Sequence, residues 1–194
     1  MDSLAWRGHT VTGSAIAGVA VRSLDPIGDM RGSLCEIHRD SWDLAPRPVQ
    51  WDVIISRAGT LRGVHVHRLR WDYVLVLTGH ATVGLKDVRP DSPSFGGVMA
   101  IDIPGDRPTV VTIPPGVAHG VYAGTELHYL YGLTVPWDGG DEDLGCRYDD
   151  PALAIPWPAV PRFVLPRDLA LADYAALVRA YAAATAGGPA PAAA

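Results

Sequence analysis

The sequence predicts an all-β protein, a barrel of the jelly-roll kind with one helix at its C-terminal end. Three observations predict this class. The 194 residues include 21 glycines and 17 prolines, short apolar runs recur at near-regular spacing, and the pattern becomes helical only near the end of the chain. Many glycines and prolines break a chain into short elements joined by turns, and regularly spaced strands are typical of sandwiches and barrels. A helical bundle is therefore excluded.

The strands are expected between residues 10 and 136, where turn sequences such as Pro104-Gly105 and Pro114-Pro115-Gly116 separate the apolar runs. The segments with an apolar or alternating strand pattern include Ala17–Arg22, Asp52–Ser56, Tyr73–Leu77, Ala81–Lys86, Val98–Ile103, Thr109–Ile113 and His128–Leu133. Within Asp168–Thr185 apolar residues recur at helical spacing, which predicts a single terminal helix packed on the barrel. We expect one domain over residues 1–182 and a disordered tail over residues 183–194, whose sequence AATAGGPAPAAA has no apolar period.

Composition narrows the functional classes. Hydrophobic residues make up 48% and charged residues 19%, as in folded proteins with a core. The net charge of -5 argues against nucleic acid as a partner, and no apolar run reaches the roughly 18 residues of a membrane span. The polar N-terminal sequence does not resemble a signal peptide. Cys35 and Cys146 match neither a metal-binding nor a disulfide spacing, so we expect a reducing cytoplasm.

One group of polar residues can carry chemistry. His65 and His67 are two apart on a predicted strand and therefore point to the same side. Asp72 follows at the start of the next strand, and His119 comes after the Pro-Pro-Gly turn. In a small barrel these four can converge on the interior, and such a set suits Fe, Ni, Mn, Zn or Cu. A single histidine on a strand is more often a core or surface residue, which is how we interpret His9, His38, His80 and His128.

This spacing resembles the two characteristic motifs of the cupin superfamily. The first motif matches from Gly59 through the two histidines and the acidic position to Gly79, and the second matches at Pro114, Gly116 and His119. In metal-binding cupins the matching residues hold a divalent ion. The resemblance therefore implies a cupin jelly roll with a possible divalent transition metal on His65, His67, Asp72 and His119.

A closer resemblance extends from about Val19 to Asp168. Five stretches carry it in order: Asp29–Glu36, Leu61–His65, Asp87–Gly96, Ile113–Gly120 and Asp150–Pro158. They are similar to the dTDP-4-dehydrorhamnose 3,5-epimerase family of nucleotide-sugar enzymes, which are themselves cupins. The resemblance implies a small-molecule nucleotide-sugar substrate, no required cofactor and a homodimer.

The resemblance also implies roles for individual residues. His65 matches the general base that removes the proton alpha to the sugar ketone, Asp168 matches the carboxylate that orients it, and Arg62 matches an arginine near the substrate. Asp168 has an alternative interpretation as the N-cap of the terminal helix. The substrate-binding candidates are Arg31, Glu36, Gln50, Arg89, His119 and Trp137. Guanidinium groups suit phosphates because their donors form a fork, although an arginine can equally be a solvated surface charge.

Two departures from the family pattern matter. The family lysine that polarises the developing enolate falls on Asp72 here, and a carboxylate would repel an enolate. The family tyrosine that acts as the acid falls within Thr134–Trp137, which contains no phenol. Tyr131 is close by but matches a different family position. A divalent ion beside the carbonyl could replace the lysine as a Lewis acid.

Three interpretations therefore remain open. The first is an isomerase that abstracts a proton alpha to the carbonyl of a dTDP-4-keto-6-deoxysugar or related metabolite, with inversion at a single centre favoured. The second is a metal-dependent cupin enzyme such as a cyclase, lyase or dioxygenase. The third is an inactive sugar or nucleotide binder. The first two compete for His65, because a histidine bound to a metal and to Asp168 has no free nitrogen to act as a base.

Overall fold

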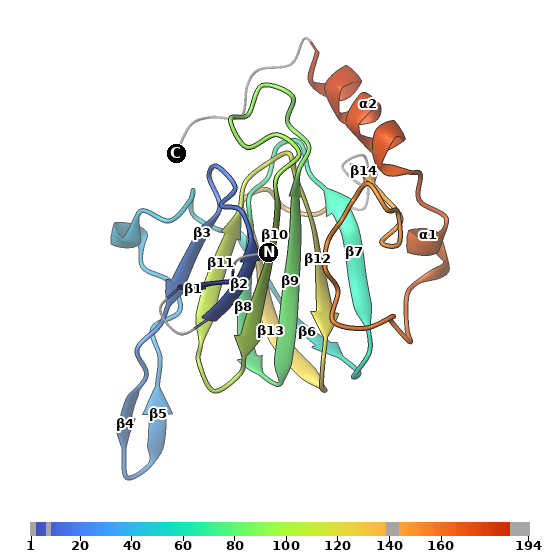
Figure 1. Ribbon diagram of the computed structural model, residues 1–194. Helices are drawn as coiled ribbons and strands as arrows, with labels where there is room; N and C mark the ends of the chain where they lie inside the picture. Colours follow the sequence, from blue (N-terminus) through green and yellow to red (C-terminus); the bar gives the residue numbers. More distant parts are fainter. Residues whose placement is uncertain (1–2, 7–8, 139–143, 187–194) are drawn as a thin grey trace.

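The computed structural model describes residues 3–6, 9–138 and 144–186, and Figure 1 shows two antiparallel sheets facing each other. The larger sheet has the strand order β1 (Ser3–Trp6), β2 (His9–Gly13), β10 (Val98–Pro104), β9 (His80–Asp87), β12 (Val117–Ala123), β7 (Leu61–Val66) and β14 (Leu144–Gly145). The smaller sheet has the order β3 (Ala20–Ser23), β11 (Thr109–Ile113), β8 (Asp72–Thr78), β13 (Leu127–Leu133) and β6 (Gln50–Ser56). The expected jelly roll is confirmed.

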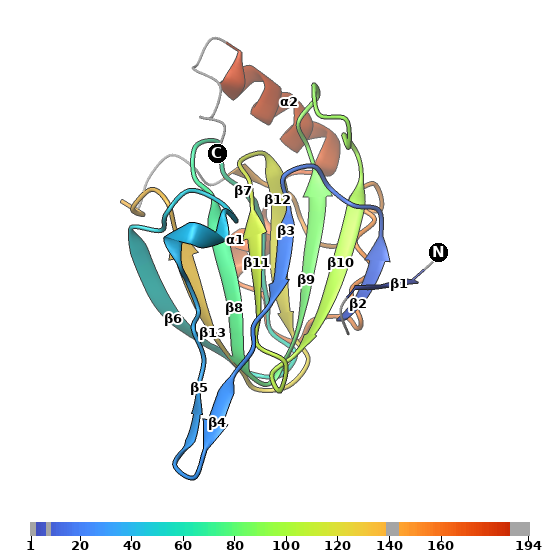
Figure 2. The same cartoon turned by 90° about the vertical axis from the view of Figure 1, so that its left-hand side faces the viewer.

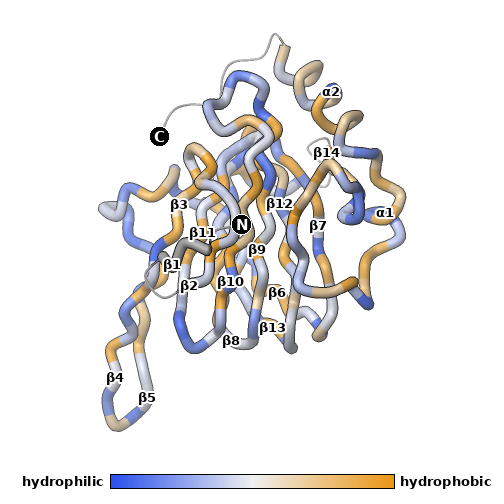
Figure 3. Tube along the Cα trace, viewed as in Figure 1, coloured by the Kyte–Doolittle hydropathy of each residue, from blue (hydrophilic) through white to orange (hydrophobic). Residues whose placement is uncertain are grey.

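The main core lies between the two sheets. Its buried side chains come from both, for example Val74 and Leu127 from the smaller sheet and Val83 and Ile101 from the larger. In Figure 3 hydrophilic stretches gather at turns and at the tip of the hairpin formed by β4 (Ile27–Asp29) and β5 (Gly32–Leu34). Removing this apolar surface from water is the main force that holds the sheets together.

A second core explains why β12 is buried at every position instead of alternating. The outer face of the larger sheet is covered by the C-terminal part of the chain, whose Leu153 and Leu177 pack against Val64 and Ala118. Gly120 permits this close cover, because a Cβ there would lie 3.2 Å from Trp157. A strand covered on both faces has no solvent side on which to place polar residues.

Each of the seven predicted strand segments overlaps a strand of the structure. The pattern did not single out a two-stranded hairpin of β4 (Ile27–Asp29) and β5 (Gly32–Leu34), which projects from the barrel in Figures 1 and 2. Every residue of its two strands is exposed. A short hairpin without a buried face lacks the apolar alternation by which strands are recognised.

The predicted C-terminal helix is confirmed, but it is not the single helix expected over 168–185. Two helices are present, α1 (Pro166–Leu169) and α2 (Tyr174–Thr185), which are separated by residues 170–173. Asp173 begins the second one, since its extended backbone lets the side chain accept a hydrogen bond from the Ala176 N–H at 2.7 Å.

The boundary of the predicted tail also needs correction. Residues 183–185 belong to α2, and the Thr185 hydroxyl donates to the Tyr181 carbonyl at 2.9 Å. Alanine is the strongest helix former, so the run of alanines that looks like a tail extends the helix. Residues 187–194 of the predicted tail lie outside the described residues. Among the described helices, none is long and apolar enough to cross a membrane.

Candidate active site

A cavity of about 370 Å³ opens between the two sheets. Strands β6 and β13 line it on one side, and β7 and β12 line it on the other. Its polar lining includes His65, His67, Arg70, His119 and Tyr131. Two of the three histidines lie side by side, because His65 and His119 are register partners on neighbouring strands of the same sheet.

His65 forms a pair with Asp168. The Nε2 atom of His65 lies 2.9 Å from Oδ1 of Asp168, and Asp168 is buried while His65 is partly exposed to the cavity. Because a carboxylate accepts, the ring proton sits on Nε2 and the lone pair on Nδ1. This arrangement orients the imidazole and stabilises its protonated form. The alternative interpretation of Asp168 as a helix N-cap is wrong, because Leu165 precedes α1 and Asp173 caps α2.

The four residues of the predicted metal set do not form one group. Within the described residues, His67, Asp72 and His119 offer ligand atoms that all lie within 4.8 Å of one another, and His65 is not among them. The hydrogen bond to Asp168 holds the His65 ring by its Nε2 and leaves Nδ1 uncommitted to that carboxylate. The described structure does not group His65 with the other three, and its role as a metal ligand stays a prediction.

Arg70 lies inside the remaining cluster. Its Nη2 is 2.8 Å from Nε2 of His67, and its Nε is 3.2 Å from Oδ1 of Asp72. All three side chains are almost completely buried. A guanidinium is charged at any ordinary pH, so a cation already contacts atoms that a metal would need. The residues, as arranged, do not fit a divalent ion.

His119 and Tyr131 complete the buried side of the cavity. His119 Nδ1 donates to the Val117 carbonyl at 3.1 Å, and its Nε2 lies 3.0 Å from the Tyr131 hydroxyl. Burial is the main cause that lowers the pKa of His119 to about 4, and the positive charges of His65 and Arg70 add to it. The neutral ring therefore accepts a hydrogen bond from Tyr131. Burial, reinforced by the nearby Asp72 carboxylate, raises the pKa of Tyr131 well above its usual 10, so the phenol keeps its proton.

Arg70 and Tyr131 are not among the predicted site residues, although the sequence carries a signal for Tyr131. Alternation along β13 puts Tyr129 and Tyr131 on one face, and both line the cavity. Arg70 stands two residues before Asp72 in the connection between two strands. Nothing in that local pattern indicates whether its side chain turns inward.

Two other predicted residues, Arg62 and Trp137, line the cavity, and a third, Gln50, contacts Trp137. Arg62 lines it and donates from Nε to the Ser56 hydroxyl at 2.9 Å. Trp137 also lines it, and its backbone N–H donates to Oε1 of Gln50 at 3.0 Å. Gln50 in turn donates from Nε2 to Asp52 at 3.0 Å. Gln50 therefore fixes the segment that carries Trp137 to the edge of β6.

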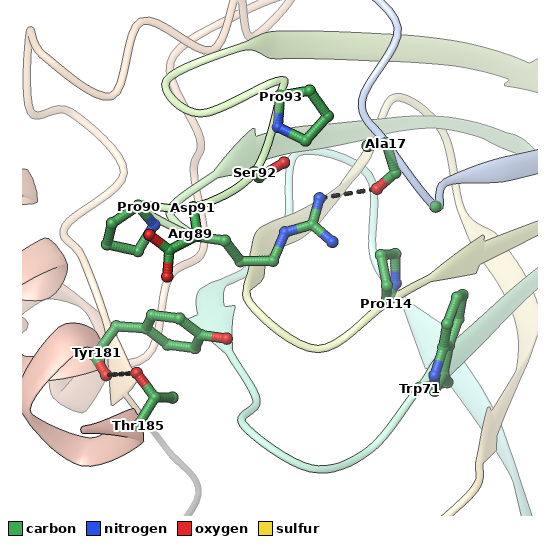
Figure 4. A pocket seen from close by; sticks show the side chains of 11 residues that line it. Ala17, Trp71, Arg89, Pro90, Asp91, Ser92, Pro93, Pro114, Tyr181 and Thr185 are labelled. Carbon is green, nitrogen blue, oxygen red and sulfur yellow. Dashed lines mark hydrogen bonds between the residues drawn. The ribbon is translucent and has the colours of Figure 1, made fainter. Parts of the chain in front are cut away.

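The remaining predicted substrate-binding residues are not brought to this cavity by the single chain. Arg31 is exposed beside the β4–β5 hairpin and pairs with Asp29 at 2.6 Å, and Glu36 pairs with Arg39. Arg89 lines a separate hollow of about 530 Å³ near α2, shown in Figure 4. The guanidinium of Arg89 is held by Asp87 and by the Ala17 carbonyl at 2.7 Å. These bonds anchor the loop that follows β9, and a substrate-binding role for Arg89 stays a prediction.

Comparisons with known proteins agree with this geometry. The sequence profile described as dTDP-4-dehydrorhamnose 3,5-epimerase matches residues 13–176. The spore coat polysaccharide biosynthesis protein SpsL of Bacillus subtilis strain 168 is 33% identical over 148 residues, which are 69% of this chain and 97% of that protein. A dTDP-4-dehydrorhamnose 3,5-epimerase of Sinorhizobium fredii is 28% identical over 162 residues, covering 78% of this chain and 82% of that protein.

A solved structure also resembles this chain closely. It is the dTDP-6-deoxy-D-glucose-3,5-epimerase RmlC of Legionella pneumophila Philadelphia 1 in complex with dTDP-4-keto-L-rhamnose. Its TM-score is 0.76 at 26% identity, and the match covers 85% of this chain and 92% of that one.

Proposed function

This chain belongs to the dTDP-4-dehydrorhamnose 3,5-epimerase family of enzymes, and from that premise we propose that it epimerises a dTDP-4-keto-6-deoxysugar. The observation that carries the proposal is the pair of His65 and Asp168, 2.9 Å apart, at the wall of a cavity between two sheets. The relatives named above, one of which binds dTDP-4-keto-L-rhamnose, support the choice of substrate.

The first step is removal of a proton from the carbon alpha to the ketone. Nδ1 of His65 takes the proton, the C–H electron pair forms the C=C bond of an enolate, and the carbonyl π electrons move to oxygen. The imidazolium that results donates from Nε2 to Asp168, whose buried negative charge stabilises it. Arg62, which lines the same cavity, donates toward the oxygen side of the substrate.

The second step returns a proton to the opposite face of the same carbon. Among the described cavity residues Tyr131 carries a phenol that is protonated at neutral pH and hydrogen-bonded to His119. We assign the proton return to Tyr131, because the other phenol of the cavity, Tyr129, is buried and Trp137 offers only an indole N–H. One base and one phenol on fixed sides favour inversion at a single centre.

No cofactor takes part in the proposed reaction. The alternative of a metal-dependent cyclase, lyase or dioxygenase is not favoured, because Arg70 already contacts His67 and Asp72. His119 then serves as the hydrogen-bond partner of Tyr131 and not as a ligand.

The proposal includes a homodimer. Strand β6 is a sheet edge whose outward side chains Val53 and Ile55 are 68% and 59% exposed, and an uncovered apolar edge invites pairing. The projecting β4–β5 hairpin carries Met30 fully exposed, and beside it Arg31. On this proposal the hairpin packs against a second copy and brings Arg31 to that copy's nucleotide.

The free thiols Cys35 and Cys146 suit a reducing cytoplasm, which we propose as the location.

Solvent exchange tests the proposal. Purified protein is incubated in D2O with dTDP-4-keto-6-deoxyglucose, and deuterium at the carbons alpha to the ketone is followed by NMR. We expect uptake at one such carbon together with the inverted product. If dTDP binds by calorimetry but no keto-sugar exchanges, the chain is a nucleotide-sugar binder and the proposal is wrong.

A further inference from the structure

Three arginines line the cavity, and they differ sharply in their surroundings. Arg62 and Arg167 are exposed, whereas Arg70 is 7% exposed. A buried charge acts in a medium of lower effective dielectric than an exposed one, and salt screens it less. Among the described arginines of the cavity, Arg70 is therefore the one with the strongest field at short range.

The partners of Arg70 hold it in place before any substrate arrives. Asp72 accepts from Nε at 3.2 Å, and its backbone is fixed at the start of β8 between Ile113 and Leu133 of the two neighbouring strands. His67 contacts Nη2 at 2.8 Å. A charged donor that is already oriented does not have to reorganise when charge develops near it, and this is the condition for effective electrostatic stabilisation.

The field of Arg70 reaches the histidines at the centre of the cavity. Its positive charge is one of the causes that lower the pKa of His119, and His119 is the register partner of His65. The guanidinium, the proposed base and the ring opposite that base therefore lie within electrostatic range of one another.

We propose that Arg70 stabilises the enolate oxygen formed when His65 removes the substrate proton, and that His67 and Asp72 position its guanidinium. The juxtaposition that carries this inference is a buried guanidinium held by a histidine and a carboxylate in the same cavity as the His65–Asp168 pair. The inference rests on the proposed function, since an enolate forms only if the proton is removed. It assigns a positioning role to residues whose spacing indicates a metal site.

The balance of charge supports this assignment. Asp72 alone would repel a developing enolate, but the Arg70–Asp72 pair has no net charge and presents its positive member to the cavity lining. Proton transfer to His65 leaves a positive imidazolium beside Asp168 and a negative oxygen beside Arg70. Each charge created in the step then lies near an opposite charge that is already present.

The test compares Arg70→Gln and Arg70→Lys with the matched control Arg68→Gln. Arg68 lies two residues away, but its guanidinium donates to the Ala184 carbonyl on α2 at 3.1 Å. Loss of one preorganised donor lowers kcat by roughly 10²–10³-fold, and we expect this for Arg70→Gln with KM changed less than about threefold. Arg70→Lys retains the charge and should recover part of the loss, whereas Arg68→Gln should match the wild type.

The outcomes of the exchange assay distinguish the role of Arg70 from the proposed function. Wild-type exchange that Arg70→Gln retains within about threefold overturns the role of Arg70 and leaves the proposed function standing. No exchange by the wild type with any keto-sugar overturns both. A rise in KM with unchanged kcat would mean that Arg70 only binds substrate, which also overturns the inference.

A second measurement does not depend on whether the Arg70 variants fold. Chelator-treated wild-type protein is titrated with Co(II), and its visible absorption bands report ligation by imidazole and carboxylate. Because Arg70 contacts His67 and Asp72, we expect no stoichiometric band with the wild type. A band at one equivalent that is lost in His67→Gln would show that a metal displaces the guanidinium and would overturn the proposal.

Discussion

Two histidines that line one cavity each pair with a carboxylate, and the two pairs differ in access and in partners. His65 is 21% exposed and bonds to Asp168, which is 103 residues away in the chain, whereas His67 is 3% exposed and lies 3.5 Å from Asp72, five residues away. The His67 pair contains Arg70 as a third member, and in the His65 pair the ring retains a nitrogen for the cavity. His65 and His67 carry the same side chain and point to the same side of the chain, so only their tertiary partners decide which of them exchanges protons.

The difference has a simple physical basis. A histidine can act as a base only if its free nitrogen meets the substrate and a nearby carboxylate stabilises the proton it gains. His67 is enclosed and contacts a permanent cation, so protonating it would place two positive charges together in a buried site. The predictions below test this division of roles, beginning with the largest effect.

Replacing the base should have the largest effect. We expect His65→Asn to lower solvent exchange into the keto-sugar by about 10⁴-fold, because general-base catalysis contributes up to that much. His67→Gln should lower it only about tenfold, because its amide oxygen can still accept from Arg70. The measurement is deuterium uptake by NMR. Equal losses in the two variants would contradict the division between the pairs.

Replacing the orienting carboxylate should have the next largest effect. Asp168→Asn removes the negative charge that stabilises the imidazolium, and we expect kcat to fall by roughly 10²–10³-fold while the fold is retained. A double-mutant cycle with His65→Asn checks the coupling, since residues that act as a unit are not additive. Additive losses would mean that Asp168 supports the helix region and not the base.

Loss of the phenol should separate the two steps of the reaction. In Tyr131→Phe we expect product formation to fall by about 10²-fold, because general-acid catalysis contributes at least that much. Proton removal by His65, seen as exchange with retention of configuration, should persist. Tyr129→Phe is the matched control, since Tyr129 lies on the same face of β13. Loss of exchange and inversion together would mean that Tyr131 acts on proton removal.

The smallest expected effect is on the pH dependence of the free energy of unfolding. His119 has a pKa of about 4 in the folded chain against about 6.5 unfolded, so the unfolded state binds more protons between these values. Stability therefore falls as pH decreases, and from pH 7 to pH 5 this residue alone accounts for a loss of about 2 kcal/mol. Urea unfolding at the two pH values measures it.

Two variants isolate the contribution of His119. His119→Gln should reduce the difference between pH 7 and pH 5, whereas replacing the partly exposed His128 by Gln should leave it as in the wild type. If the difference in stability between pH 7 and pH 5 is unchanged in His119→Gln, then burial in the cavity does not keep this ring neutral.

Local patterns in the sequence are enough to predict where the strands lie, because apolar runs bounded by turn residues are typical of strands. Thr109–Ile113 is predicted and observed over the same residues, and it is buried throughout between its neighbours. The C-terminal region shows the limit of such patterns. Helical spacing continues through residues 168–185, but Asp173 caps a new helix there, and a cap depends on backbone geometry that periodicity does not carry.

In the candidate site, too, some features follow from the sequence pattern and others only from the tertiary structure. The sequence determined by itself that His65 and His67 share one face of a strand, since alternation is a property of the extended chain. Through the family resemblance it also indicated that Asp168 is the distant carboxylate that pairs with His65. Only the tertiary structure decided that Asp168 meets His65, that Arg70 enters the cluster of His67 and Asp72, and that the Arg89 side chain is held elsewhere. Those outcomes depend on contacts between side chains from separate elements, and such contacts leave no period or spacing in the sequence.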